Sequence, residues 1–154
     1  MGDNNKQARL LQQLIYDTIA LGKAMKLQVT HLSSNAISME APVANVNINI
    51  HGTAFAGSIY NICALSAWGL VHMRLLTEDI SAEVVLAQAN IRYLLPIKDS
   101  IRTTCVVDET DFEEFQTRLL RKGKASLSVT VNAQENNKVQ ASLDARIAVK
   151  IITS

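Results

Sequence analysis

Residues 45–76 read NVNINIHGTAFAGSIYNICALSAWGLVHMRLL, and Arg74 is their only charged side chain. The segment begins with asparagines that alternate with apolar residues and passes through His51-Gly52-Thr53. From Ala54 it continues in a long helical pattern. This order predicts a strand or loop that leads into the N-terminus of a buried helix.

The helical part, residues 54–71, is also long and apolar enough to be a candidate for a membrane span. Ser58, Asn61 and Ser66 interrupt it, and the residues that follow from Ala82 are typical of strands. A helix wrapped by a sheet accounts for both features. We therefore expect a core helix and no membrane span.

The 154 residues predict a single domain, 1–154, that is large enough for a hydrophobic core without disulfide or metal staples. A net charge of +1 argues against nucleic-acid binding and favours a small molecule or a second copy of the chain as partner. Two unclustered cysteines, Cys63 and Cys105, indicate core residues of a reducing compartment rather than a metal site. The N-terminus lacks the order of a signal peptide, so we expect a cytoplasmic protein without metal or cofactor.

Further elements flank the central helix. An amphipathic helix is expected over Lys6–Met25, and a hairpin over Val29–Ala41 with its turn at Ser33-Ser34-Asn35. Strands are expected at Glu83–Leu95, Ile101–Val107, Ser126–Gln134 and Val139–Ile152. Residues 111–121 have helical spacing with Gly123 as a C-cap, although a strand over residues 114–120 is an open alternative.

Together these elements predict an α+β domain of the hotdog architecture, in which a curled antiparallel sheet wraps around a long central helix. A sheet of so few strands leaves exposed edges. Pairing of two protomers into one continuous sheet would cover an edge, so we expect a homo-oligomer built on dimers.

Five motifs keep their order and spacing along the chain: Ile19-Ala20-Leu21, Ala41-Pro42-Val43, Asn47-x-Asn49-x-x-Gly52-Thr53-Ala54-Phe55-Ala56-Gly57-Ser58, Ala67-Trp68-Gly69 and Ile91-Arg92-Tyr93-Leu94-x-Pro96. From about residue 10 to about residue 150, the chain resembles the thioesterase-like domain at the C-terminus of YiiD-type acetyltransferases. Ala20 and Ala56 depart from the family's Pro and Gly, and neither change removes an obvious chemical group. The resemblance implies a hotdog fold that acts on acyl thioesters of coenzyme A or acyl carrier protein.

The chain also resembles a wider group of hotdog thioesterases whose loop has the form Asn-x-x-Gly-x-x-His-Gly-Gly and whose catalytic Asp falls at position 64 here. Asn49, Gly52 and Gly57 match this form, but Phe55 replaces the His and Ala64 replaces the Asp. A carboxylate there would act as nucleophile or general base, and alanine can do neither. The mechanism of that group therefore does not transfer whole.

The electrostatic part of that chemistry survives. Backbone N–H groups at a helix N-terminus are unpaired donors in a positive field, so they can polarise a thioester carbonyl. Gly57 and Ser58 are the candidate donors, and a residue without a Cβ permits close approach of a ligand. Asn61 lies one turn before Ala64 on the same face, where it would hold a water or the carbonyl; a purely structural role is the alternative.

Six residues are candidates for substrate binding: Asn47, Asn49, His51, Thr53, Phe55 and Tyr60. A turn-forming role is the more common use of Asn in such loops, and it stays open for both asparagines. His51 could serve as a general base, with a surface histidine as the alternative. The two aromatic residues fit the core or the walls of an acyl pocket.

Two other patterns carry less weight. Ser66, His72 and Asp144 are excluded as a hydrolase triad, because no strained Gly-x-Ser-x-Gly turn surrounds the serine. A basic run, Arg118, Arg121, Lys122 and Lys124, could meet the phosphates of coenzyme A or an acidic carrier protein, and a solvated helix end is the alternative.

The leading hypothesis from the sequence is an acyl-thioester hydrolase for coenzyme A or carrier-protein thioesters, with the carbonyl polarised by the N-terminus of the central helix. Its rival is a non-catalytic module that binds or senses acyl thioesters, which the alanine at position 64 supports. A hotdog dehydratase or hydratase is disfavoured, because the central helix carries no Glu.

Overall fold

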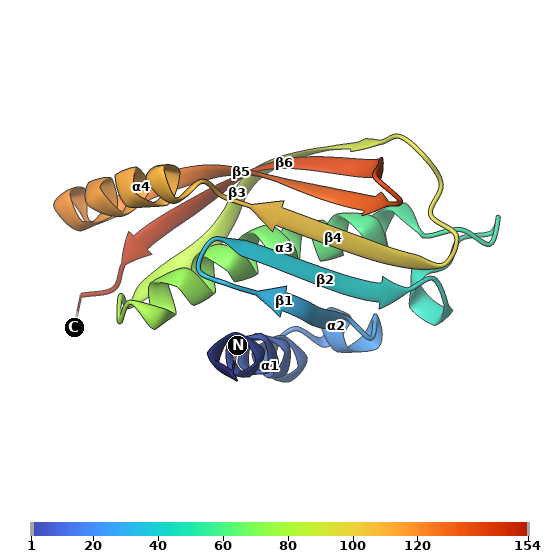
Figure 1. Ribbon diagram of the computed structural model, residues 1–154, viewed down its shortest axis with the longest axis horizontal. Coiled ribbons are helices and arrows are strands. Elements are labelled where there is room, and N and C mark those ends of the chain that lie inside the picture. The colour runs from blue at the N-terminus through green and yellow to red at the C-terminus, as the bar shows by residue number, and fades with distance from the viewer. Residues whose placement is uncertain (1, 154) are drawn as a thin grey trace.

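The computed structural model describes residues 2–153 and is built around helix α3, Ala56–Thr77. A six-stranded antiparallel sheet curls around this helix in the order β1-β2-β4-β5-β6-β3 (Figure 1). The strands are β1 Gln28–Leu32, β2 Ala36–Pro42, β3 Ala82–Tyr93, β4 Ser100–Val106, β5 Lys124–Glu135 and β6 Lys138–Ile151. The curled antiparallel sheet around a central helix that the sequence predicts is therefore confirmed.

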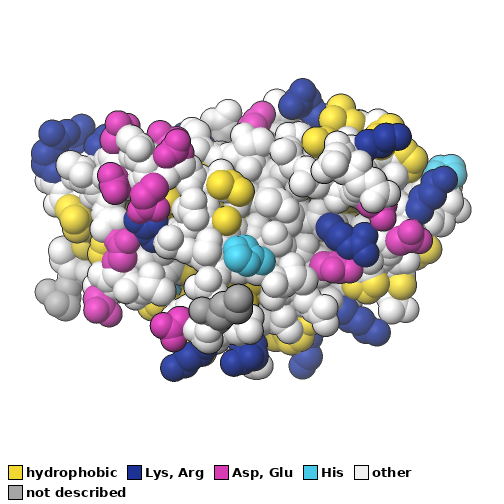
Figure 2. Space-filling model, in the orientation of Figure 1, with side chains coloured by type: hydrophobic (Ala, Val, Ile, Leu, Met, Phe, Trp, Pro, Cys, Tyr) yellow, Lys and Arg dark blue, Asp and Glu magenta, His cyan; other side chains and the backbone are white. Residues whose placement is uncertain are grey.

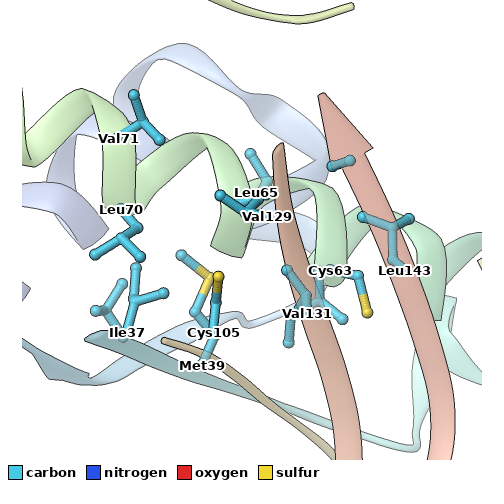
Figure 3. Packing of buried hydrophobic residues seen from close by; sticks show 14 of the residues in the cluster. Ile37, Met39, Cys63, Leu65, Leu70, Val71, Cys105, Val129, Val131 and Leu143 are labelled. Carbon is cyan, nitrogen blue, oxygen red and sulfur yellow. The ribbon is translucent and has the colours of Figure 1, made fainter. Parts of the chain in front are cut away.

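The core lies between α3 and the concave face of the sheet. Figure 3 shows side chains of α3, such as Leu65 and Leu70, among side chains of the surrounding strands, including Ile37, Cys105 and Val131. The concave face is apolar because alternate residues of each strand point inward, as the burial of β4 and β5 shows. Burial raises the pKa of the Cys63 and Cys105 thiols to about 12, so both are inert core residues.

Helix α3 meets the length and composition of a membrane span, yet 67% of its most apolar window is buried inside the protein. It is the core helix that the interrupting polar residues indicated. The preceding segment is a loop with a short 3-10 helix, η1, at Asn45–Asn47, and Ile48 forms an isolated antiparallel bridge with Ala54.

The expected single helix over Lys6–Met25 is wrong. The chain forms α1, Gly2–Thr18, and a short α2, Ala20–Ala24, because Ile19 adopts an extended conformation between them. A β-branched side chain is comfortable in that conformation. Gly22 then packs against α1, where a Cβ would lie 2.4 Å from Ile15 Cγ2, so the break allows α2 to fold back closely.

The helix expected over residues 111–121 is confirmed as α4, Glu109–Lys122, and the alternative strand over residues 114–120 is not formed. The Asp108 side chain accepts a hydrogen bond from the Thr110 N–H at its start, and Gly123 closes it in the left-handed conformation at φ 75°. Phe112, which is buried, lies beneath the guanidinium of Arg74 from α3. These contacts hold α4 against the C-terminal end of α3.

The two edges of the sheet differ. Strand β1 is short, bulged after Val29 and packed against α1, whereas β3 is long. Just before β3 the Ser81 carbonyl accepts from the Ile152 N–H, and just after β3 the Leu94 N–H donates to the Gln140 carbonyl of β6. A bulge at Ala87 shifts the alternation of hydrogen-bonded residues between these two points. It follows that the backbone groups of Ala89, Ile91 and Tyr93 face away from β6.

The first half of that edge is partly covered by the chain itself. The Val84 carbonyl also faces away from β6, and it accepts a 2.8 Å hydrogen bond from the indole N–H of Trp68 on α3. His72 stacks on the same indole, with 4.7 Å between ring centroids. The free backbone groups are therefore concentrated in the second half of β3.

Candidate functional site at the N-terminus of α3

Helix α3 begins without a side-chain cap. Phe55 is the N-cap residue, and its carbonyl accepts hydrogen bonds from the N–H groups of Ser58 and Ile59. Within residues 2–153, the N–H groups of Ala56 and Gly57 have no hydrogen-bond partner. These two donors therefore point away from the helix at its N-terminus, which is the positive end of the helix dipole.

The candidate pair of donors thus shifts by one residue from Gly57 and Ser58 to Ala56 and Gly57. The N–H of Ser58 is engaged by Phe55, and its buried hydroxyl lies 3.4 Å from the Val46 carbonyl. This side chain ties η1 to α3 and is not placed to contact a ligand. The sequence could have indicated this pair, because the N–H groups at the very start of a helix have no partner within the helix.

Asn49 organises the loop that precedes the helix. Its side-chain oxygen accepts from the N–H groups of His51 and Thr53, and its amide donates to the Thr53 hydroxyl and the Ala54 carbonyl. All of these bonds are local, as expected of a turn-forming Asn. His51 is consequently carried on the exposed outer side of the loop, with Gly52 beside it at φ 76°.

Asn47 lies deeper than its neighbours. Its amide donates to the carbonyls of Met25 and Pro42, both at 2.9 Å, so it joins α2 to the end of β2. The side-chain oxygen is buried and finds no hydrogen-bond partner within the described residues. The residue holds the base of the loop in place rather than facing a cleft.

Asn61 lies one turn into α3 and is partly exposed. Its amide is 3.0 Å from the Met25 sulfur, which is a weak acceptor, and its oxygen accepts no hydrogen bond from residues 2–153. Side chains on a helix lean toward its N-terminus. The side chain therefore leans toward the first turn of α3, and Asn61 lies four residues after Gly57.

Tyr93, at the end of β3, was not among the predicted site residues. Its hydroxyl donates a 2.9 Å hydrogen bond to the Ala56 carbonyl, so the last residue of an edge strand is fixed to the first residue of α3. Burial is the main cause of a raised pKa, which keeps the phenol protonated as a donor. The sequence signal was the Ile91-Arg92-Tyr93-Leu94-x-Pro96 motif, which carried the resemblance but no role.

A cleft of about 350 Å³ opens between this tyrosine and the loop. Asn49, Thr53, Ala54, Ala56 and Ile59 line it on one side, and residues 93–97 line it on the other. Of the predicted binding residues, the structure brings Asn49 and Thr53 to this cleft. Phe55 and Tyr60 lie outside its lining; the Phe55 ring is half exposed and lies over Gly57, and Tyr60 packs partly buried against the core.

Exposed apolar side chains surround the same end of the molecule. Ile50 is 95% exposed at the tip of the loop, and Val46, Ile48, Leu94 and Leu95 are each about half exposed. Figure 2 shows hydrophobic side chains at the end where the loop between β2 and α3 lies in Figure 1. The cleft is thus set in an apolar rim, which suits a ligand with a hydrocarbon part.

The rejected triad is also not assembled. Ser66 is buried and hydrogen-bonded to the Ile62 carbonyl and the Thr103 hydroxyl, each at 2.7 Å. Asp144 accepts from Thr130 on the sheet, and His72 stacks on Trp68. Within residues 2–153 no group of three or more His, Cys, Asp or Glu side chains is arranged to hold a metal ion.

The curled antiparallel sheet, the enclosed helix and a cleft at that helix's N-terminus define a protein of the hotdog-fold class. The chain belongs to the family described as "Putative thioesterase (yiiD_Cterm)", whose model matches residues 8–150. The family expected from the sequence motifs is therefore confirmed, and with it the hotdog fold.

Solved structures agree with this assignment. A "putative thioesterase" from Shewanella oneidensis is 30% identical, with a TM-score of 0.83 over 94% of this chain and 97% of that one. A protein of unknown function from Chlorobaculum tepidum is 25% identical, with a TM-score of 0.88 over 96% of both chains. The PaaI protein of E. coli, at 13% identity and a TM-score of 0.66 over 97% and 96% of the two chains, supports the fold alone.

Proposed function

We propose that this protein hydrolyses acyl thioesters of coenzyme A or acyl carrier protein at the N-terminus of α3. The observation that carries the proposal is the pair of N–H groups of Ala56 and Gly57, which lack partners within the described residues; Ala56 also lines the cleft, whose rim is apolar. Such donors stabilise the oxyanion that forms when a thioester carbonyl is attacked. Hydrolysis of a thioester is the reaction that best uses them.

The proposed step is a direct attack by water. The Asn61 oxygen accepts a hydrogen bond from the water and orients it toward the carbonyl carbon, while Ala56 and Gly57 hold the carbonyl oxygen. A new C–O bond forms as the attacking water loses one proton to solvent, the C–S bond breaks, and the sulfur leaves as a thiolate that takes up a proton from solvent. The hydrocarbon tail lies in the apolar region beside α3.

The experiment that tests this function is release of free thiol from acyl-coenzyme A esters of increasing chain length, run in parallel with acyl carrier protein esters. Turnover that saturates with substrate supports a hydrolase. Binding of the same esters without turnover supports the alternative, a non-catalytic binding or sensing module, which the methyl group of Ala64 in place of a carboxylate favours.

We further propose that the active form is a dimer joined through β3. Within residues 2–153, the backbone groups of Ala89, Ile91 and Tyr93 that face away from β6 have no hydrogen-bond partner, and they form an edge at which a second strand can pair. Antiparallel pairing centred near Ile91 would bring each partner's β3 alongside Tyr93, and hence alongside the candidate site. The site would then be completed by the second protomer.

Ala89→Pro is expected to convert the dimer into a monomer. The Ala89 N–H faces away from β6, so proline removes no hydrogen bond within the chain but blocks pairing at that edge. Sedimentation at micromolar concentration measures the mass, and Ala89→Ser, which retains the N–H, is the matched control. A monomeric wild type, or a proline variant that stays dimeric, would contradict pairing through β3.

Gly57→Val is expected to lower turnover by about tenfold to a hundredfold, because a displacement of about 1 Å at a reacting group has effects of that size. A Cβ at this position would lie 2.5 Å from the Phe55 ring, which is half exposed and free to move outward, so the fold should survive. Turnover and urea unfolding are measured together. Unchanged kinetics with unchanged stability would remove Gly57 from the site.

We also propose that the protein is cytoplasmic. The support is that Cys63 and Cys105 are both free and buried, which fits a reducing compartment. Fractionation of cells that produce the protein, followed by detection in the soluble or periplasmic fraction, tests the placement.

A further inference from the structure

A second cleft, the basic groove, lies on the outer face of the sheet. It has a volume of about 500 Å³, and Lys122, Lys124, Arg146 and Lys150 line it with a single carboxylate, Glu83. These residues come from the end of α4 and from β5, β6 and β3, so the fold gathers them from distant parts of the sequence. Four cations in one groove are unusual for a chain with a net charge of +1.

The cations of the basic groove are not explained by the stability of the fold. None of the four forms an ion pair with any residue from 2 to 153. Lys150 is the direct cross-strand partner of Lys124 on one side and of Glu83 on the other, so the one carboxylate of the groove faces one of its four cations, and the like charges of Lys124 and Lys150 repel. A bound anion would convert this repulsion into attraction.

The residues at the base of the basic groove indicate which class of anion it could bind. Val85, Ala148 and Val149 give it an apolar base, and Ser126 adds a hydroxyl. A ligand with several negative charges and a flat apolar ring would satisfy both parts, and the volume is that of a small-molecule site. A nucleotide with phosphates at two positions has this chemistry, and coenzyme A contains such a nucleotide.

In the proposed dimer, the basic groove of one protomer lies closer to the candidate site of the partner than to the candidate site of the same protomer. Along one β3, Val85 and Tyr93 are roughly 26 Å apart at about 3.3 Å per residue. In the proposed dimer, pairing centred near Ile91 places Val85 of each strand beyond the partner's Tyr93. There it would adjoin residues 94–97 of the partner, which border the cleft.

We propose that the basic groove of one protomer binds the phosphates of coenzyme A while the thioester carbonyl lies at α3 of the other protomer. This rests on the proposed function and on the dimer. The pantetheine arm passes beyond the end of β3, and the adenine covers Val85 and Ala148. The proposal selects coenzyme A, rather than a carrier protein, as the thiol that the protein recognises.

The test combines Lys124→Ala with Lys150→Ala. For an acyl-coenzyme A substrate, KM should rise roughly tenfold or more with kcat little changed, because charge-assisted contacts to phosphate are lost. For the same acyl group on N-acetylcysteamine, which has no nucleotide, neither constant should change. Lys6→Ala combined with Arg9→Ala removes two exposed charges from α1 and is the matched control.

An equal effect on both substrates, or no effect on either, would overturn the proposal. So would a loss confined to the carrier-protein ester, which would mark a protein-docking surface. Calorimetry with adenosine 3′,5′-bisphosphate separates this inference from the proposed function, because it needs no turnover. Binding by wild type that the Lys124 and Lys150 changes weaken supports the groove even in a protein without hydrolase activity, and absence of binding refutes it.

Discussion

Asn61→Ala is expected to lower the turnover of acyl thioesters by about 100-fold to 1,000-fold, the typical cost of losing one positioning or oxyanion contact. The side-chain oxygen is free of hydrogen bonds within the described residues, and it lies one helical turn from the two free N–H groups. Within residues 2–153 the one hydrogen bond of its amide is to the Met25 sulfur, a weak acceptor, so the fold loses little hydrogen bonding when the side chain is shortened.

Thiol release by the variant is measured beside its urea unfolding curve. Asn5→Ala, on the exposed face of α1, is the control for the same change elsewhere in a helix. Equal turnover by Asn61→Ala and wild type would show that the water is activated by another group. His51, exposed on the adjacent loop, would then be the next residue to change.

Ala64→Asp separates the two functional hypotheses. If wild type binds acyl thioesters without hydrolysing them and the Asp variant hydrolyses them, the protein is a binding module with the geometry of its catalytic relatives. If wild type hydrolyses them, the added carboxylate should raise turnover further by supplying a general base. No gain in either case would mean that position 64 does not face the bound carbonyl.

Arg74→Met is expected to lower the free energy of unfolding by about 1.5 to 3 kcal/mol, the usual contribution of hydrogen bonds to charged groups. The buried guanidinium binds Glu78, Glu109 and the Ser34 carbonyl, and it therefore joins α3, α4 and the turn after β1. The loss should stay below that of a fully buried pair, because both carboxylates reach solvent and can be rehydrated.

Urea unfolding measures this change, with Arg102→Met as the control. Arg102 pairs with Glu40 and Glu135, but it is 46% exposed, so its loss should cost below about 1 kcal/mol. Hydrogen bonding to Arg74 lowers the pKa of Glu109 below its ordinary value of 4.5. The stabilisation is therefore complete above pH 4.5 and is lost as the pH falls through the lower folded pKa. Equal losses in both variants would contradict a special role for Arg74.

The parts of the fold that were predictable are those governed by local patterns. The apolar run into α3, the αL glycine at 123 and the alternation of the later strands each follow from short-range physics, and each was found. The break at Ile19 was not, because it depends on how closely Gly22 packs against Ile15 once α2 folds back. The hydrophobic periodicity of the sequence does not predict the contact between Gly22 and Ile15.

The site was only partly predictable for a similar reason. The loop and the helix N-terminus lie next to each other in the sequence, so Asn49 and Gly57 could be proposed together. Tyr93 reaches Ala56 from the end of a strand that lies far along the chain, and only the topology brings them within 2.9 Å. The same reason applies to the basic run of the sequence, whose last two members, Lys122 and Lys124, join Arg146 and Lys150 only through the pairing of β5 with β6.

The claim that the first N–H groups of α3 hold the thioester carbonyl is tested most directly by NMR of ¹⁵N-labelled protein. The titrant is an acyl-coenzyme A analogue in which a methylene replaces the thioester sulfur, so that the carbonyl is kept and hydrolysis is blocked. The amide proton resonances of Ala56 and Gly57 should move downfield more than those of other residues as the analogue binds. Saturable binding that leaves these two resonances unmoved, with the largest changes elsewhere, would contradict the account.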